Sequence, residues 1–327
     1  MVPTGVASSG GRTQEGKTHM RLLRTLALGA SLLVLLGACT TGGGSTTKPT
    51  ISIGSDGFYE SQIIAEMYAQ VLEAAGYTVE RNLGMGARAV TAPALESGQI
   101  DLKPEYIGSG VAFYDPDRVS SDSDETADAL AEVLGEKGIS VLDYSPGEDY
   151  DAFAVRRDTS EELGLTRMSD LAAVQEQLFW GLPPECDVNP VCRGALEDTY
   201  GIDWPPQNLV SLAACDAPIA EALNGGAVDI AELCSTQPAI AQFDFVVLDD
   251  DMGTAPAQNI APIVRDDYLS QLAEEDRTEF ERLLNDVSAT LTTDALIELG
   301  VATQVTNTDI ADAARDFLLE KGLLTAS

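Results

Sequence analysis

Side chains that can act as nucleophiles or metal ligands are scarce in this sequence, which limits the chemistry it can perform. Its single histidine, His19, lies in an N-terminal segment that we expect to be removed. Without an interior histidine, neither a histidine-activated nucleophile nor a histidine-ligated catalytic metal can be built. A pair of carboxylates acting across a cleft is the remaining enzymatic option, but no motif supports it. We therefore expect a protein that is not an enzyme and that holds no metal or cofactor.

The segment before Cys39 has the layout of a secretion signal. A basic pair, Arg21 and Arg24, precedes the apolar run Leu26–Ala38, which is shorter than the roughly 20 residues of a membrane-spanning helix. Small residues directly before a cysteine are similar to the bacterial lipobox, in which a peptidase cuts before the cysteine and its thiol carries a lipid. We expect Cys39 to become a lipidated N-terminus that anchors the protein outside the cell membrane. An ordinary signal followed by a chance cysteine is the alternative.

The N-terminal region divides into three parts by composition. We expect an upstream extension before the true start, then the signal, then a flexible Gly/Ser/Thr-rich tether: residues 1–19, 20–38 and 39–49.

Four cysteines remain after the expected cleavage, besides Cys39 itself. An even number in an exported chain indicates disulfides. The pairing we favour joins neighbours in the sequence, Cys186 with Cys192 and Cys215 with Cys234. A metal site is the alternative, but the two-residue spacing of zinc ribbons is absent.

Acidic side chains greatly outnumber basic ones. The chain has 53 Asp and Glu against 19 Lys and Arg, a formal net charge of −34. Such a surface repels phosphate backbones and anionic lipid. We therefore exclude nucleic acid as a partner and expect membrane attachment only through the N-terminal lipid. We also expect a monomer.

The order of the expected elements is typical of an α/β fold. Short apolar or alternating segments predict strands near residues 51–55, 78–83, 100–102, 140–143, 178–182 and 245–248. Apolar residues at three-to-four-residue spacing predict helices near 63–72, 88–97, 125–137, 168–177, 266–291, 293–299 and 309–321. The alternation of strands and helices at the start predicts a parallel sheet with helices on its faces.

Several motifs carry a resemblance to one known family. They are Gly54–Phe58, Glu66–Gln70, Ala94–Gly110, Phe153–Asp158, Ala261–Arg265 and the tail Asp309–Leu323. The Pro-Glu-Tyr segment at 104–106 is the most specific. Across residues 50–323 the chain resembles the glycine betaine/choline/carnitine class of osmoprotectant-binding proteins of ABC importers.

The resemblance implies a type II periplasmic-binding fold, in which two α/β lobes are joined by two crossover strands and the ligand lies in the cleft between them. Lobe one would comprise residues 50–151 and 262–327, and lobe two residues 152–261 with the hinge crossover. Ligand binding would close the hinge and present both lobes to a permease.

Members of this family hold a quaternary ammonium group in a cage of tyrosines, because aromatic faces attract a cation that has no N–H donor. Tyr106 occupies one cage position. The other three positions fall on non-aromatic residues: Asp151, Cys234, and Gln258 or Asn259. We therefore expect a ligand more polar than glycine betaine.

Further polar side chains are expected near the cleft. Ser109, in the turn after Tyr106, can offer a hydroxyl and backbone N–H groups. Asp56 stands where the family has a lysine, and together with Asp151 it favours a cationic or N–H-bearing solute. The alternatives, which are core packing for the tyrosine, turn chemistry for the serine and simple solvation for the acids, stay open.

The function implied by the resemblance is capture of a small osmoprotectant-like solute outside the membrane and its delivery to an ABC permease with its ATPase. Two alternatives remain at this point: a ligand-sensing lipoprotein on the same fold, and a binder of a different polar or cationic solute.

Overall fold

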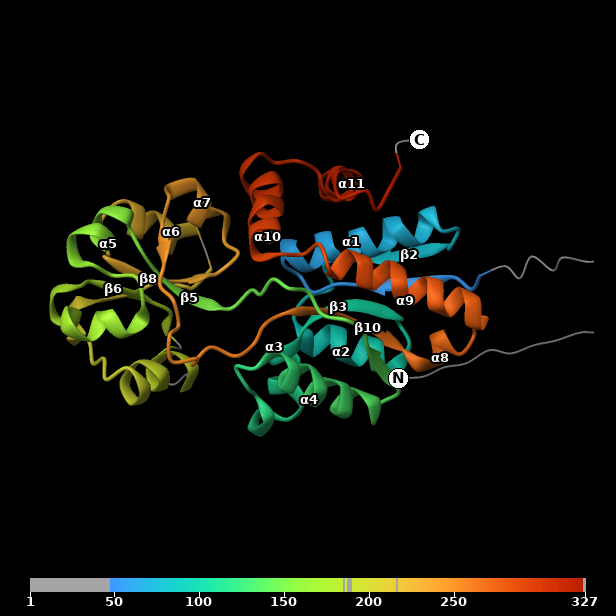
Figure 1. Ribbon diagram of the computed structural model, residues 1–327, viewed down its shortest axis with the longest axis horizontal. Helices are drawn as coiled ribbons and strands as arrows, with labels where there is room; N and C mark the ends of the chain where they lie inside the picture. The colour runs from blue at the N-terminus through green and yellow to red at the C-terminus, as the bar shows by residue number, and fades with distance from the viewer. Residues whose placement is uncertain (1–47, 185, 187–189, 216, 326–327) are drawn as a thin grey trace, which may run out of the picture. The chain divides into compact units, whose positions relative to one another are not determined.

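The computed structural model describes residues 48–184, 186, 190–215 and 217–325. Its strands form two five-stranded sheets (Figure 1). The first sheet contains β1 (Ile51–Gly54), β2 (Val79–Asn82), β3 (Leu102–Tyr106), β4 (Ile139–Val141) and β10 (Ile260–Arg265), in the order β2-β1-β3-β10-β4. The second contains β5 (Asp151–Val155), β6 (Trp180–Leu182), β7 (Leu209–Ser211), β8 (Ile230–Cys234) and β9 (Val246–Val247), in the order β7-β6-β8-β5-β9.

Each sheet with its helices is called a lobe below. Lobe one has the helices α1 (Tyr59–Ala74), α2 (Arg88–Ser97), α3 (Ile107–Tyr114), α4 (Ser123–Gly135), α8 (Asp266–Leu269), α9 (Glu274–Ser288), α10 (Thr293–Gly300) and α11 (Ile310–Glu320). Lobe two has α5 (Arg157–Leu163), α6 (Ala217–Asn224) and α7 (Pro238–Phe243). Short 3-10 or π segments are η1 (Pro116–Arg118), η2 (Met168–Ala173), η3 (Gln175–Gln177), η5 (Pro190–Thr199), η6 (Pro206–Asn208) and η7 (Val301–Val305).

Both faces of the lobe-one sheet are covered, because side chains alternate between the two sides of a strand. On β10, Ile260 and Val264 pack with residues of α1, α9, α10 and α11. Ala261 and Ile263 on the same strand pack with residues of α2, α3 and α4. The sheet is therefore the middle layer of three, which explains why β1, β3 and β10 are buried along almost their whole length.

The predicted α/β alternation is confirmed, with one difference in strand direction. β1 pairs in parallel with both β2 and β3, as expected. β10, which follows lobe two in the chain, pairs antiparallel with β3 and β4. The sheet is consequently mixed, because β10 returns to it from lobe two and runs opposite to β3.

Two predicted helices differ from the structure. The segment near 168–177 forms two short 3-10 helices, η2 and η3, rather than an α-helix. The predicted helix at 266–291 is two helices, α8 and α9, with residues 270–273 between them. The third predicted strand also starts later, since Ile100 and Asp101 belong to the turn before β3.

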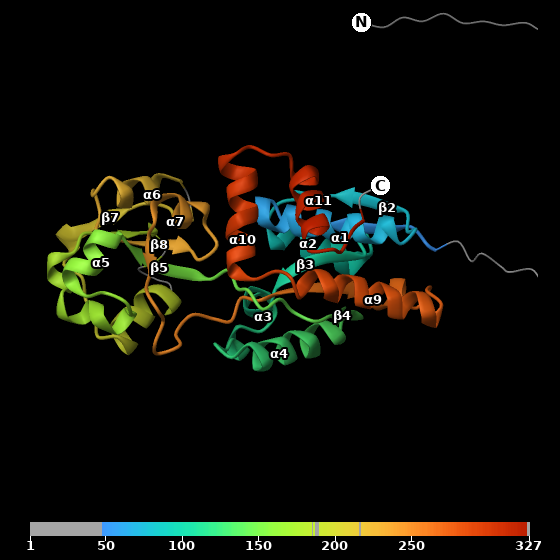
Figure 2. The same ribbon diagram turned by 45° about the horizontal axis from the view of Figure 1, so that its top comes forward.

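Two segments connect the lobes: residues 142–150, called the first linker, and residues 248–259, called the second linker. They pair antiparallel at Glu148 and Asn259. Asn259 Nδ2 donates to the carbonyl oxygen of Ser145 at 2.9 Å, and the backbone N–H of Ile260 donates to Ser145 Oγ at 2.8 Å. The linkers are therefore bonded to each other. Away from the linkers, α10 of lobe one contacts α7 of lobe two (Figure 2).

The structure contains the disulfides Cys186–Cys192 and Cys215–Cys234. The first lies in the core of lobe two. Cys39 and the rest of the predicted signal and tether up to residue 47 lie outside the described residues. Among the described residues, no helix is both long enough and apolar enough to span a membrane.

Candidate functional site

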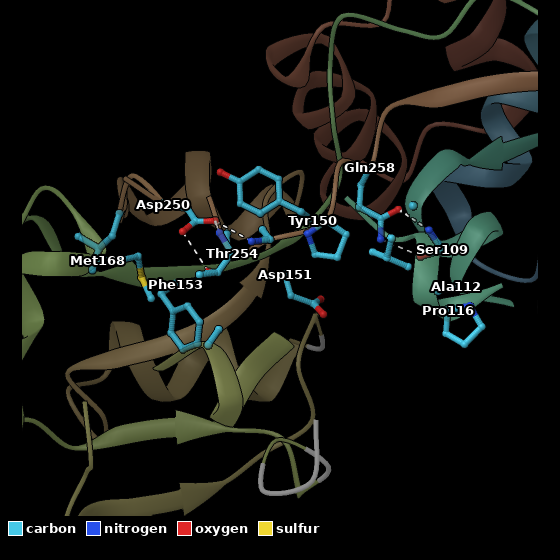
Figure 3. Close-up of a pocket in the computed structure, with 17 residues that line it drawn as sticks. Ser109, Ala112, Pro116, Tyr150, Asp151, Phe153, Met168, Asp250, Thr254 and Gln258 are labelled. Atoms are coloured by element: carbon cyan, nitrogen blue, oxygen red, sulfur yellow. Dashed lines mark hydrogen bonds between the residues drawn. The ribbon is translucent and has the colours of Figure 1, made fainter. Parts of the chain in front are cut away.

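A cavity of about 370 Å³ lies beside the two linkers and is lined by both lobes (Figure 3). We call it the Ser109 cavity. It brings together three of the residues expected at the site, Ser109, Asp151 and Gln258. The Gln258 amide holds the start of α3: its Oε1 accepts from the Ser109 backbone N–H at 3.1 Å, and its Nε2 donates to Ser109 Oγ at 2.8 Å. The polar atoms of this pair therefore bond to each other in the structure.

Gly108 explains how α3 approaches the second linker so closely. A Cβ atom on this residue would lie 2.3 Å from the carbonyl oxygen of Ala257, which is backbone and cannot yield easily. The absence of a side chain thus allows the linker to pass against the helix start and places Gln258 beside Ser109.

Asp151 and Cys234 are direct neighbours across the β5–β8 pairing. Asp151 lines the Ser109 cavity, and Figure 3 shows its carboxylate between Phe153 and the Ser109–Gln258 pair. Cys234 lines a different cavity and is bonded there to Cys215. The two predicted positions therefore lie side by side but open onto different spaces.

The second cavity is larger, about 690 Å³, and is also lined by both lobes. We call it the Glu60 cavity. Lobe one contributes the start of α1, with Phe58, Tyr59 and Glu60, and lobe two contributes residues around β8, α6 and α7. Asp149 of the first linker completes the wall. Aromatic faces and carboxylates therefore meet in this space.

Glu60 is the most unusual side chain of the Glu60 cavity. It is only 1% exposed, and its Oε1 accepts from the hydroxyl of Tyr106 at 2.6 Å. Its Oε2 is buried and has no hydrogen-bond partner in the part of the chain that the structure describes. Burial, together with the neighbouring Asp149, raises the pKa of Glu60 to about 8, although the hydroxyls of Tyr106 and Thr236 act in the opposite direction.

Asp149 is partly accessible, yet its surroundings are also desolvated. Desolvation raises the pKa of Asp149 to about 6; hydrogen bonds from Thr236 oppose this rise, and the charge of Asp151 adds to it. The backbone N–H of Thr236 donates to Asp149 Oδ1 at 3.3 Å. Both carboxyl groups therefore resist ionisation at neutral pH more than ordinary carboxyl groups do.

Tyr106 connects the Glu60 cavity with the interior of lobe one. It is the last residue of β3, 4% exposed, and its ring lies 5.5 Å from that of Phe58 between centroids. Its hydroxyl donates to Glu60, and its backbone N–H donates to Glu105 Oε1 at 2.9 Å. The predicted cage tyrosine is thus placed next to the Glu60 cavity.

Asp56 does not face either of these cavities, contrary to our expectation. It is 3% exposed, and both of its carboxylate oxygens lie 3.2–3.3 Å from Lys103 Nζ. Lys103 is fully buried and needs counter-charges, which Asp56 supplies together with Glu105 Oε2 at 3.0 Å. The physical reason for the difference is therefore an internal cation that takes up the carboxylate.

The Lys103 cluster, as we call this group, consists of Asp56, Arg88, Thr91, Lys103 and Glu105. Thr91 Oγ1 donates to Asp56 Oδ1 at 2.5 Å, and Arg88 forms a salt bridge with Glu105 at 2.7 Å. Burial alone would raise the pKa of Glu105, but Lys103 and Arg88 hold it below its usual value. Two cations and two carboxylates thus balance inside lobe one.

Asn259 also lies away from the cavities. It is 3% exposed and joins the linkers through Ser145, so its amide serves the hinge region in the structure. Its neighbour Gln258 is the amide that reaches the Ser109 cavity.

The residues that the sequence reasoning missed are those of the Glu60 cavity. Phe58, Tyr59 and Glu60 lie just beyond the loop that follows β1, at the carboxyl end where α/β sheets place ligand sites. The rule applied to Tyr106 could therefore also have found them. Asp149 carried no comparable signal, because its distance from α1 depends on how the linker crosses between the lobes.

Two α/β lobes joined by two linkers, with cavities lined by both lobes, define the type II periplasmic-binding fold. Comparison of the chain with known proteins identifies its family. The model of the substrate-binding domain of ABC-type glycine betaine transport systems matches residues 49–320, and the chain belongs to this family. The family consists of substrate-binding proteins of ABC transporters rather than enzymes.

Two relatives illustrate the similarity. The chain is 26% identical over 306 residues to the glycine betaine-binding protein YehZ of Escherichia coli, covering 91% of this chain and 98% of that protein. It is 26% identical over 313 residues to a glycine-betaine-binding protein of Pseudomonas aeruginosa, covering 93% and 96%. The solved structure of apo YehZ from Escherichia coli has a TM-score of 0.73 at 25% identity, covering 84% of this chain and 99% of that one.

Proposed function

We propose that this protein is an extracytoplasmic, lipid-anchored receptor that captures a small osmoprotectant-like solute and delivers it to the permease of an ABC importer. The observation that carries the proposal is the Glu60 cavity. It is lined by both lobes, so a bound solute would contact both and favour their closure. Membership in a family of transport binding proteins supports the delivery step.

The solute class is supported by the lining of this cavity. Phe58 is 44% exposed, and Tyr59 lies beside it at the start of α1. Aromatic faces attract ammonium and methylated ammonium groups. Asp149 and Glu60 add carboxyl groups beside these faces, which accept hydrogen bonds and carry negative charge when they are ionised.

A thermal-shift screen tests the solute proposal. Glycine betaine, choline, carnitine, proline, ectoine and polyamines are each added to the protein, and at least one should raise the melting temperature in a concentration-dependent way. Tyr59→Ala should reduce that shift, whereas Tyr114→Ala, at a half-buried position of lobe one that lines neither cavity, should not. No shift with any of these solutes would contradict the proposed function.

The anchor is tested separately. Cys39→Ala should move the protein from the membrane fraction to the soluble fraction and abolish labelling by a fatty-acid probe. Equal membrane retention of both forms would show that another element holds the protein at the membrane.

A further inference from the structure

The carboxyl groups of the Glu60 cavity have no cationic partner on the cavity wall in the part of the chain that the structure describes. Three carboxyl groups line the cavity, those of Glu60, Asp149 and Glu221. Among the described residues that line it there is no lysine, arginine or histidine. Neither Glu60 nor Asp149 forms a salt bridge with any described residue.

Other buried carboxylates in lobe one do have cations. Glu66 is 4% exposed and bonds to Arg81 at 2.7 Å, and Asp56 and Glu105 share Lys103. Burying an ionised carboxylate without a partner is strongly unfavourable. Glu60, at 1% exposed, is therefore an exception within its own lobe.

The geometry around Glu60 leaves one acceptor open. Its Oε1 is taken by Tyr106, and its buried Oε2 has no hydrogen-bond partner in the described part of the chain. Since Glu60 lines the cavity, a group bound there can supply the missing partner. Asp149 approaches the same space from the first linker, so a bound group can contact two carboxylates from different elements.

We propose that the Glu60 cavity binds a compact organic cation that carries no carboxylate, and that Glu60 and Asp149 together are its counter-ions. This inference rests on the proposed function, because it specifies the solute for the same site. Phe58 and Tyr59 face the cation from α1, and a ligand carboxylate is disfavoured by the two acids. The preference is thus for a cation over a zwitterion with the same ammonium head.

Proton release follows from the groups that face Glu60. They are Tyr59 on α1, Tyr106 on β3, Asp149 on the first linker and Thr236 after β8, with Glu221 of α6 also on the cavity wall; none of them is basic. With a pKa of about 8, Glu60 is mostly protonated at pH 7 before the ligand binds. A bound cation favours the ionised form, so binding releases a proton. Affinity therefore rises as the pH increases from about 6 to about 8, by up to about tenfold per pH unit for each proton released.

Choline and glycine betaine are a matched pair for the test, because both carry a trimethylammonium group and only glycine betaine has a carboxylate. Titration calorimetry at pH 8 should show choline binding at least about tenfold more tightly, since like charges at an interface are strongly disfavoured. At pH 7, runs in two buffers of different ionisation enthalpy should show proton release on choline binding.

The variants Glu60→Gln and Asp149→Asn keep the size of each side chain and an acceptor oxygen. Each should weaken choline binding by about tenfold or more at pH 8. Each should also reduce the difference in affinity between choline and glycine betaine. Glu60→Gln should also abolish most of the proton release. The control Glu162→Gln removes the same charge from an exposed position on α5 and should change neither.

The possible failures are distinguishable. Glycine betaine binding as tightly as choline, or choline affinity unchanged in both variants, overturns the cation inference and leaves the solute-binding function standing. Absence of binding by choline, glycine betaine and every other solute of the thermal-shift screen overturns both.

Discussion

Desolvated carboxyl groups gather in two regions that differ in charge balance, one inside lobe one and one where lobe one meets the first linker. In the Lys103 cluster, Asp56 and Glu105 are matched by Lys103 and Arg88, and none of the four lines the Glu60 cavity. In the Glu60 cavity, Glu60 and Asp149 have no matching cation among the described residues that line it. Tyr106 touches both regions, through its backbone N–H on one side and its hydroxyl on the other.

This difference separates structural acids from binding acids. The charges of the Lys103 cluster are already paired, so a ligand has no charge to neutralise there. The cluster therefore contributes to the stability of the fold. An unbalanced set of desolvated acids beside an open space costs stability unless a ligand supplies the charge. Charge balance is therefore a better guide to the binding site here than the presence of acidic residues alone.

The largest effect should come from breaking the balanced region. Lys103→Met leaves Asp56 and Glu105 without their shared cation and should lower the free energy of unfolding by about 3–5 kcal/mol. Urea denaturation at pH 7, followed by circular dichroism, measures it. Lys321→Met is the control, because an exposed pair with Glu320 is worth at most about 1 kcal/mol. Equal midpoints for both variants would show that the cluster is not a stabilising unit.

The Glu60 cavity should show a smaller effect, which is a loss of stability as the pH rises. The pKa of Glu60 is raised on folding from 4.5 to about 8, so the stability it contributes is complete below pH 4.5 and is lost as the pH rises through 8. Between pH 6 and 8 Glu60 loses most of what remains of this contribution and Asp149 goes from about half ionised to ionised, so the ligand-free protein should lose about 2–3 kcal/mol.

Glu60→Gln should flatten that pH dependence, and chemical denaturation at pH 6, 7 and 8 checks it. A wild-type protein equally stable at the three pH values would contradict the assignment of a desolvated, unpaired acid to this position.

The smallest effect should come from the residue that touches both regions. Tyr106→Phe removes the hydrogen bond to Glu60 and should cost about 1 kcal/mol. Because that hydrogen bond lowers the pKa of Glu60, its loss should move the midpoint of the pH profile upward. Tyr114→Phe, which removes a hydroxyl bonded to Glu96 at the surface, is the matched control and should leave the profile unchanged.

Local signals in the sequence were sufficient for most of the fold. The predicted helix near 88–97 ends where Gly98 adopts a left-handed conformation, and the strand near 78–83 matches β2. The prediction of an α-helix at 168–177 was wrong, because apolar spacing does not distinguish an α-helix from two short 3-10 helices. The antiparallel insertion of β10 also has no local signal, since it depends on a partner strand far away in the sequence.

The site was less predictable than the fold for the same reason. The sequence suggested that Asp56 faces the cleft. In the structure it bonds instead to Lys103, which is 47 residues away in the sequence. Ser109 and Gln258, 149 residues apart, meet only because the second linker passes α3. Roles assigned to single polar residues therefore changed once their tertiary partners were known.

The position of β10 has a consequence for the order in which the chain can fold. It lies between β3 and β4, so the lobe-one sheet has a gap until residues 260–265 are available. Lobe two needs no such late segment, because its strands all lie between residues 151 and 247. Pairings between distant segments form slowly, because the loop between them must close first. Lobe two should therefore complete its sheet first, while β3 and β4 keep exposed edges that can pair with other chains until β10 arrives.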